Sequence, residues 1–426
     1  MTTTSDNVSP DPCGCSDYQA VSRRSMLKGA GVVGLAGAAG ITTSMVGDVM
    51  TAAVYGAETT GNVLVVVSQR GGVDGLSMVV PHAEKAYYQA RPTTAIAKSR
   101  LLHRDNTFGL HPSFRALSPM WKKDAFAVVH AVGMPIPNRS HFSAMEEVED
   151  ADPGSVARVG WLNRMIGALG DDDIFEGVAL GTNVVPTSLV GPAEAVALAS
   201  AGYLATPYSG SATGNSIRQG LREMYSAGNR PAARAGLNAL DLAKRGLAYS
   251  EESLKPPRNK AVYPGSAFGT SLRNAASLIR AGVGVRAIAV DSGGWDHHLN
   301  LGTAMSNGVA DLAGSLAAFF TDLGPAAQRV TVVTLSEFGR RLGENGASGV
   351  DHGYGNAVLV MGAGVRGGRY YGRWPTLNSG KQIEGDLAVT TDYRHVLTEI
   401  LQSRFPSVDT SVVFPNQGYR RVGIMR

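Results

Sequence analysis

The feature that most constrains the fold is a series of continuous apolar runs, rich in β-branched residues, that recur along the chain. The runs cover residues 62–67, 125–131, 178–180, 287–290, 330–335 and 357–361. A run without polar alternation is typical of a strand buried on both faces of a sheet. Between several runs lie helical patterns, and in residues 301–323 the apolar side chains recur with the 3.6-residue helical period. We therefore predict an α/β fold with a mostly parallel central sheet and helices on both faces.

The same pattern predicts a single domain over residues 58–426. No internal repeat or low-complexity linker follows residue 60, and one large α/β domain can hold a chain of this length. Residues from about 186 to 275 carry helical patterns without strong strands, and we interpret them as a helical insertion. With 44% hydrophobic and 17% charged residues, the composition is typical of a globular protein rather than a disordered tail or a membrane bundle.

The first part of the chain has the features of an export signal. A polar segment leads to Arg23 and Arg24, which precede an apolar, glycine-rich run at residues 29–41 and small residues at 52–57. We predict a twin-arginine signal peptide over residues 1–57, recognised by the twin-arginine export machinery and cleaved near Ala57. The protein would then be periplasmic, cell-envelope or extracellular. Because the apolar run is too short to cross a bilayer of roughly 30 Å, we expect no stable transmembrane anchor.

Charge, cysteine content and missing motifs exclude several classes of protein. The formal net charge is +4, and Lys and Arg are scattered, so we expect no nucleic-acid partner. The only two cysteines, Cys13 and Cys15, lie in the predicted signal, which excludes a disulfide scaffold or thiol catalysis in the main domain. Residues 362–367 have the glycine spacing of a dinucleotide site but no helix pattern follows them. No Gly-x-Ser-x-Gly elbow is present, which argues against an α/β-hydrolase.

Polar side chains gather next to the ends of several predicted strands. Ligands of open α/β sheets bind beyond the carboxyl ends of the strands, so these side chains are candidates for a common site. Carboxylates together with imidazoles suit a divalent ion such as Zn²⁺ or Mn²⁺, and we expect one or two such ions. The candidates are Asp74, Ser140, Asp296, His297, His298, Glu337, Asp351 and His352.

The candidates also have ordinary structural explanations. Asp74 lies near glycines and could close a turn, and Ser140 could be the N-cap of the helix that follows it. Glu337 has a spacing to Arg340 and Arg341 that suits a salt bridge. The other candidates could be surface or turn residues. The residue types alone leave both interpretations open.

A set of ordered motifs resembles the exported bacterial family known as domain of unknown function 1501. The motifs are RGGVDGLSMVVP at 70–81, NRSHF at 138–142, GGWDHH at 293–298, SEFGR at 336–340, DHG at 351–353 and DYR at 392–394. The resemblance covers about residues 60–422. That family is similar to the alkaline phosphatase and sulfatase superfamily, whose members hydrolyse phosphate or sulfate esters with a metal-bound Ser, Thr or modified Cys as nucleophile. The resemblance therefore implies an alkaline-phosphatase-like fold.

The resemblance also implies a role for each matching position. Ser140 corresponds to the nucleophile at the start of a helix, and Asp74 corresponds to the metal ligand after the first strand. Arg139, or an arginine such as Arg340, would neutralise the anionic ester, because a guanidinium matches phosphate or sulfate oxygens in a bidentate manner. The other implied metal ligands are Asp296, His298, Glu337, Asp351 and His352.

One departure from the superfamily bears on the number of ions. Where the superfamily has Asp-His-Gly, this chain has Glu337-Phe338-Gly339, so one metal site loses an imidazole. We expect the site of Asp296, His298 and His352 to survive, with His297 as a competitor for the role of His298. We therefore expect an exported, metal-dependent hydrolase of a phosphate or sulfate ester, with Ser140 as the attacking group. The alternative is a non-catalytic binding or cell-envelope assembly protein with a degenerate site for an anionic or cell-envelope ligand, which Phe338 favours.

Overall fold

A computed structural model of the chain describes residues 61–426, apart from 154, 156, 171–172, 201–211 and 227–230. The predicted signal peptide over residues 1–57 lies outside the described residues. The described residues all belong to one compact unit, residues 59–426. Within this part of the chain, no helix combines the length and the apolar character needed to cross a membrane.

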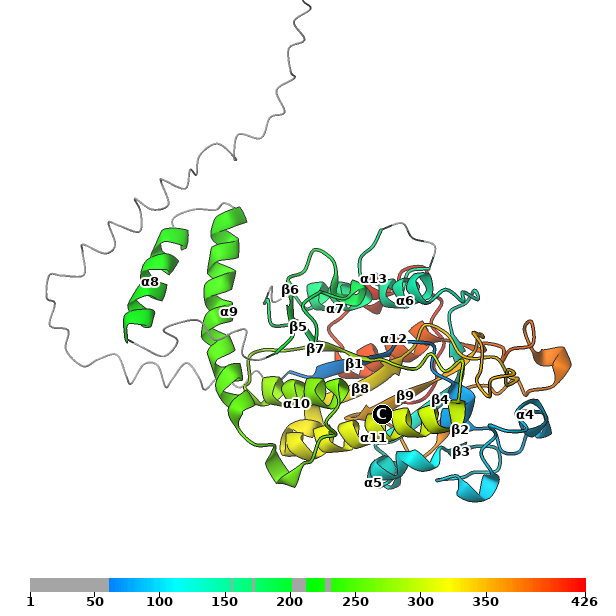
Figure 1. The fold of residues 1–426 in the computed structure, drawn as a ribbon. Coiled ribbons are helices and arrows are strands. Elements are labelled where there is room, and N and C mark those ends of the chain that lie inside the picture. The colour runs from blue at the N-terminus through cyan, green and yellow to red at the C-terminus, as the bar shows by residue number, and fades with distance from the viewer. Residues whose placement is uncertain (1–60, 154, 156, 171–172, 201–211, 227–230) are drawn as a thin grey trace, which may run out of the picture. The chain divides into compact units, whose positions relative to one another are not determined.

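Every apolar run found in the sequence forms a strand of one nine-stranded sheet (Figure 1). Its strands are β1 Val63–Gln69, β4 Phe126–Gly133, β5 Gly177–Leu180, β6 Ala195–Leu198, β7 Ala287–Ser292, β8 Val330–Leu335, β9 Asn356–Gly362, β10 Tyr370–Tyr371 and β11 Thr391–Asp392. Their order is β10-β4-β9-β8-β1-β7-β5-β6, with β11 also paired to β4. Neighbouring strands are parallel except at β9, which is antiparallel to β4 and β8. The mostly parallel sheet predicted from the sequence is confirmed.

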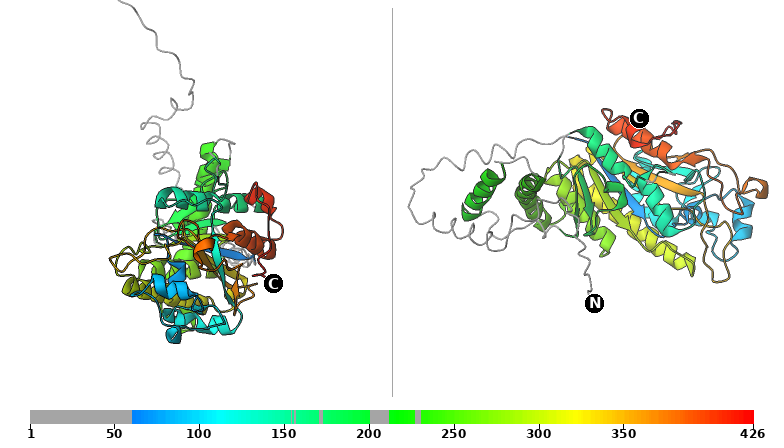
Figure 2. Two further views of the ribbon diagram at one scale, coloured as in Figure 1. Left: turned by 90° about the vertical axis from the view of Figure 1, so that its right-hand side faces the viewer. Right: turned by 90° about the horizontal axis from the view of Figure 1, so that it is seen from above.

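Helices cover both faces of this sheet. One face carries α5 Ser118–Lys122, α10 Ala267–Arg280 and α11 Leu301–Leu323, and the other carries α6 His141–Asp150, α7 Trp161–Leu169, α12 Tyr393–Arg404 and α13 Thr410–Val413. In Figure 2 the yellow α11 and the red α12 lie on opposite sides of the sheet. The helix predicted over residues 301–323 has the same bounds in the structure, because its apolar stripe packs on the sheet.

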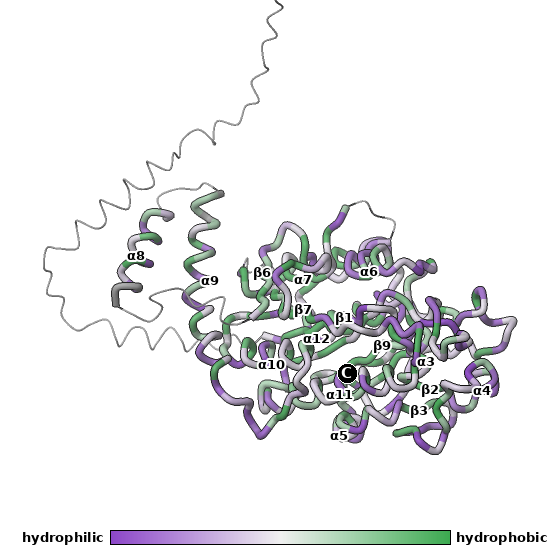
Figure 3. Tube along the Cα trace, viewed as in Figure 1, coloured by the Kyte–Doolittle hydropathy of each residue, from purple (hydrophilic) through white to green (hydrophobic). Residues whose placement is uncertain are grey.

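The central strand β1 shows why its sequence has no polar alternation. Val63, Val65 and Val67 belong to the hydrophobic cluster on one face of the sheet. Leu64 and Val66 belong to the cluster on the other face. Figure 3 shows hydrophobic residues concentrated along the central strands. A strand covered by helices on both faces favours apolar side chains at nearly every position.

The segment expected as a helical insertion, residues 186–275, differs from that expectation at both ends. It contains β6, which pairs in parallel with β5 at the edge of the sheet. Only the last residue of β6 is fully buried, and the strand has just four residues. At the other end, α10 continues to Arg280 and packs on the sheet. The helical part between them is α8 Ala212–Ser226 and α9 Pro231–Leu254, which contact each other.

The direction of β9 decides which polar residues can meet. The carboxyl ends of β1, β4, β7 and β8 lie on one side of the sheet, which we call its carboxyl edge. The amino end of the antiparallel β9 lies at the same carboxyl edge. Residues that precede β9 therefore approach residues that follow the other strands. Beside this edge lie the short helices α3 Gly75–Met78 and α4 Lys85–Ala90 and a two-stranded sheet of β2 Val79–Val80 and β3 Gly109–Leu110.

Candidate metal centre

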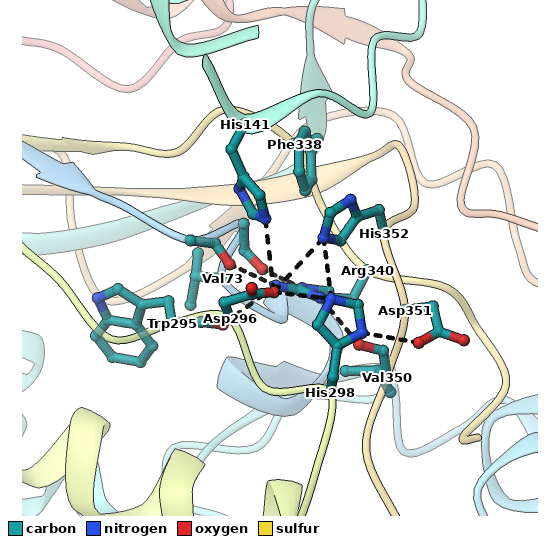
Figure 4. Close-up of polar contacts among 12 residues, drawn as sticks. Val73, His141, Trp295, Asp296, His298, Phe338, Arg340, Val350, Asp351 and His352 are labelled. Carbon is teal, nitrogen blue, oxygen red and sulfur yellow. Dashed lines mark hydrogen bonds and ion pairs between the residues drawn. The ribbon is translucent and has the colours of Figure 1, made fainter. Parts of the chain in front are cut away.

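Polar side chains from distant segments meet at this edge of the sheet (Figure 4). His141 is the first residue of α6, which follows β4. Asp296 and His298 follow β7, and Arg340 follows β8. His352 precedes β9 and reaches the group because β9 is antiparallel. The topology thus assembles a cluster from segments that are more than 200 residues apart at the extremes.

The imidazoles of this cluster converge on the Oδ1 atom of Asp296. This atom lies 3.0 Å from His298 Nε2 and 3.5 Å from both His141 Nε2 and His352 Nε2. The Nε2 atoms of His298 and His352 are 3.0 Å apart. His141, Asp296 and His352 offer ligand atoms within 4.8 Å of one another, a separation that one metal ion can bridge.

The second nitrogen of each imidazole, Nδ1, is held by an oxygen outside the centre. The pairs are His141 with Glu337 Oε1 at 2.8 Å, His298 with Asp351 Oδ1 at 2.8 Å, and His352 with the Arg139 carbonyl oxygen at 2.9 Å. Carboxylates and carbonyls only accept hydrogen bonds, so these partners assign the proton to Nδ1 and turn the Nε2 lone pair toward the centre. Histidines that bind metals typically have such outer partners.

Two observations show that the residues fit a divalent ion. The Nε2 atoms of His298 and His352 lie 3.0 Å apart, and with a proton on each Nδ1 their lone pairs repel unless a proton or a cation lies between them. His141 Nε2 is buried and has no hydrogen-bond partner, although buried polar atoms are rarely left unpaired. Imidazole nitrogens together with a carboxylate oxygen form a donor set that suits Zn²⁺ and similar ions.

The buried Arg340 controls the charge of Asp296. Its Nη2 donates to Asp296 Oδ1 and to the Gly71 carbonyl, each at 2.5 Å, and its Nε donates to the Gly72 carbonyl at 2.5 Å. Burial by itself would raise the pKa of the Asp296 carboxyl. The hydrogen bond and charge of Arg340, together with His298, hold that pKa below its ordinary value. Asp296 is therefore an ionised carboxylate beside a permanent cation.

Other protonation states in the centre also suit metal binding. Burial lowers the pKa of the His352 imidazole, and the charge of Arg340 acts in the same direction, against the hydrogen bond to a backbone carbonyl. Hydrogen bonds from His298 and Asn345 lower the pKa of the Asp351 carboxyl. Metal ligands must be deprotonated, so the lowered pKa of the His352 imidazole suits a ligand, and the lowered pKa of Asp351 suits its role as the acceptor for His298 Nδ1.

Phe338 and a glycine form the wall behind the imidazoles. The Phe338 ring centroid lies 4.9 Å from that of His141 and 4.8 Å from that of His352, and Figure 4 shows the phenyl ring beside both. Gly72 has a φ of 58°, and a Cβ atom at this position would collide with the Phe338 ring. The Phe338 ring therefore packs against two candidate ligands and limits their rotation.

The structure does not bring Asp74 into this group. Asp74 is completely buried, and both of its oxygens accept hydrogen bonds from Arg91, with Oδ1 3.0 Å from Nη2. Burial by itself would raise the pKa of this carboxyl, but the charge and hydrogen bonds of Arg91 lower it. Arg91 also donates to the carbonyl of Leu342 at 2.8 Å. The structure thus engages Asp74 as the ion-pair partner of Arg91, and its role as a metal ligand stays a prediction.

Glu337 and Asp351 orient imidazoles and do not face the centre themselves. Apart from its histidine, Glu337 accepts from the Gly71 backbone N–H at 2.8 Å and from the Ser336 hydroxyl at 3.0 Å. Asp351 accepts from Asn345 at 3.0 Å in addition to its histidine. The structure therefore places these two predicted ligands in an outer layer, on the Nδ1 side of the imidazoles.

The two residues expected in catalysis lie at the amino end of α6. Ser140 is exposed at the N-cap position, and its side chain makes no capping hydrogen bond. The guanidinium of Arg139 pairs with Glu384 at 2.7 Å and with Asp386 at 2.5 Å. Arg139 therefore contributes its backbone carbonyl to the centre, while its side chain is engaged elsewhere.

His141 is the member of the centre that the sequence analysis misses. It follows Ser140 directly in the motif NRSHF, in which the sequence analysis assigns a role to Ser140 and none to the histidine. A signal was present in the sequence: NRSHF follows a predicted strand and contains a histidine, as do the motifs GGWDHH and DHG. His297 is buried, with its ring centroid 5.9 Å from that of Trp295, so His298 is the histidine of the pair that joins the centre.

The fold and the centre together define an α/β protein with a group of histidines and one aspartate at the carboxyl edge of its sheet. The chain belongs to the family described as "Protein of unknown function (DUF1501)", whose model matches residues 62–398. The resemblance of the motifs to domain of unknown function 1501 is confirmed, and the match includes all residues of the centre. No curated protein and no solved structure matches the chain.

Proposed function

We propose that this protein is an exported hydrolase with an alkaline-phosphatase-like fold that uses a divalent metal ion, Zn²⁺ or Mn²⁺, to cleave a phosphate or sulfate ester. The observation that carries the proposal is the convergence of three imidazole Nε2 atoms on Asp296 Oδ1, with each Nδ1 held from outside. The location agrees with it, because ligands of open α/β sheets bind at this edge.

The engaged carboxylates support one ion rather than two. Asp74 is paired with Arg91, and Glu337 already accepts three hydrogen bonds. Phe338 takes the position of an imidazole. A second ion would have to break buried ion pairs or hydrogen bonds, which is costly. The ligands of the single ion would be His141, Asp296, His298 and His352.

The neighbouring residues have separate roles in this proposal. A bound divalent ion would supply Lewis-acid stabilisation of charge on an ester oxygen. Ser140 would attack the ester; it lies at the amino end of a ten-residue helix, where the partial positive charge favours an anionic group. Arg340 keeps Asp296 ionised. Arg139 acts as a positioning residue, because its anchored backbone holds His352 Nδ1.

A non-catalytic binding or cell-envelope assembly protein is the second candidate. The phenyl group at position 338 and the internal pairing of Asp74 favour it, because both depart from the two-metal arrangement of the superfamily. Export through the twin-arginine pathway is compatible with both candidates. The two candidates differ in metal content, because a scaffold does not need a stoichiometric ion.

The first experiment measures metal content. We expect about one equivalent of a transition metal in the purified protein by elemental analysis. The double variant Asp296→Ala/His352→Ala should lose this ion. Asp291→Asn is the matched control, because Asp291 is an exposed carboxylate at the end of the same strand, β7, and pairs with Arg70 instead. A folded, metal-free wild-type protein would overturn the hydrolase proposal in favour of the binding protein.

The second experiment tests the nucleophile. With p-nitrophenyl phosphate and p-nitrophenyl sulfate as substrates, Ser140→Ala should lower kcat by at least about 10³-fold, because removal of a nucleophile eliminates the covalent step. The variant should retain its metal, since Ser140 is outside the group of ligands. An unchanged kcat would show that the assignment of Ser140 is wrong.

A further inference from the structure

A cavity of about 550 Å³ opens directly beside the candidate metal centre. His141, Asp296 and Glu337 line one end of it. From there it extends between α6 and the segment of residues 184–187, which leads into the short 3₁₀ helix Thr187–Leu189. Its volume is in the range of small-molecule sites. A ligand bound at the centre would therefore place its remaining atoms in this cavity.

The walls of the cavity away from the centre are largely apolar. They are formed by Phe142, Met145, Val184, Val185 and Pro186. Phe142 is 88% exposed and Val184 is 72% exposed, so large apolar surfaces from two different segments face solvent at the same cavity. A single exposed apolar residue needs no explanation, but an apolar wall next to a polar centre is typical of a ligand site.

The charges in the cavity exclude a second anion on the ligand. Glu146 and Glu149 line it in addition to the carboxylates of the centre. Arg70 is the only Lys or Arg among the described residues that line it, and its guanidinium pairs with Glu149 at 2.7 Å and with Asp291 at 2.8 Å. An additional phosphate, sulfate or carboxylate would meet carboxylates and no free cation, so like charges would repel it.

We infer that the ligand is an ester with one anionic group, held at the centre, and an uncharged apolar group that packs against Phe142 and Val184. This inference rests on the proposed function and specifies its substrate class. A cavity of this kind favours aryl or alkyl esters over nucleotides, sugar bisphosphates and sulfated polysaccharides. The apolar wall supplies affinity for the leaving group, and the carboxylates discriminate against polyanions.

Non-hydrolysable phosphonates test this inference by titration calorimetry on the metal-loaded protein. Phenylphosphonate and methylphosphonate share the anionic group and differ in apolar area, and the Kd of phenylphosphonate should be lower by at least about tenfold. 3-Phosphonopropionate, which adds a carboxylate, should bind more weakly than methylphosphonate. Benzenesulfonate and methanesulfonate provide the same comparison for a sulfate-ester site.

Variants of the wall separate the inference from the proposed function. Phe142→Ser/Val184→Ser should reduce the preference for the phenyl ligand to less than about threefold. Val262→Ser is the matched control, because Val262 is 83% exposed and lies outside the cavity, and it should leave the preference unchanged. Equal Kd values for phenyl and methyl ligands on a metal-loaded protein overturn the inference alone. Absence of the metal, or binding of none of these ligands, overturns the proposed function.

Discussion

Asp74 and Asp296 both follow the carboxyl ends of adjacent parallel strands, yet their carboxylates have opposite surroundings. Asp74 is completely buried, and Arg91 donates to both of its oxygens. Asp296 has a side chain that is 48% exposed, and three imidazoles approach one of its oxygens. Arg340 also donates to this oxygen, while its other N–H groups reach backbone carbonyls and His298 Nε2.

The difference teaches how to distinguish a structural carboxylate from a functional one. Asp74 has a dedicated partner and no free coordination position, so its role is to hold the segment around Arg91 and Leu342 in place. At Asp296 one donor, Arg340, and three imidazole Nε2 atoms approach the same oxygen, and the imidazole nitrogens compete for a cation there. Strand-end position alone does not separate the two cases, whereas the partners of each oxygen do.

The largest effect is expected when the buried ion pair of Asp74 and Arg91 is broken. Arg91→Met leaves the Asp74 carboxylate buried without its partner, and the free energy of unfolding should fall by about 3–5 kcal/mol. Urea unfolding monitored by circular dichroism measures it. The double variant Asp74→Leu/Arg91→Met should recover a large part of the loss, because no buried charge remains. A loss below about 1 kcal/mol for Arg91→Met would show that the pair is not structural.

The pH dependence of stability sharpens the same contrast. Because Arg91 lowers the pKa of Asp74 in the folded protein despite its burial, the ion pair contributes its full stability above the ordinary carboxyl pKa of 3.8. The contribution is lost as the pH falls through the lower pKa of the folded state. The difference in unfolding free energy between wild type and Asp74→Asn should therefore shrink below about pH 4. A difference independent of pH contradicts this prediction.

A smaller effect is expected for the outer layer of the centre. Asp351→Asn removes the charge that orients His298, so the Kd of the metal should rise by about tenfold. Because Asp351 has an exposed side chain, the unfolding free energy of the metal-free protein should change by less than about 0.5 kcal/mol. Competition with a chromogenic chelator measures the affinity, and Asp291→Asn serves as the control. An unchanged Kd would remove Asp351 from the centre.

The smallest effect concerns two serines at helix starts. Ser266 accepts a hydrogen bond from the Gly269 N–H at 2.9 Å, so Ser266→Ala should cost about 1 kcal/mol of stability. Ser140 makes no capping bond, and Ser140→Ala should cost less than about 0.5 kcal/mol. Thermal unfolding of the two variants side by side measures both changes. Equal losses would identify Ser140 as an ordinary N-cap.

The fold was more predictable than the centre. The strands over residues 62–67 and 330–335 and the helix over 301–323 follow from local patterns, and the structure contains all three. In the centre, the motifs with Asp296 and His352 indicated the correct segments. They did not indicate that His141 would join the group or that Asp74 would leave it, because both outcomes depend on partners from other elements.

By itself the sequence determined where the strands and helices form and which strand ends carry acids and histidines. A strand buried on both faces has a nearly unbroken apolar run, and a packed helix has an apolar stripe with a 3.6-residue period. Both patterns can be recognised from residues that are close in the sequence. The tertiary structure alone decided that β9 runs antiparallel, which brings His352 to the edge where His141 and Asp296 lie. It also decided that Arg91 captures Asp74. Strand direction and ion pairing between distant segments are properties of the packed chain, because each is selected by contacts that no local pattern contains.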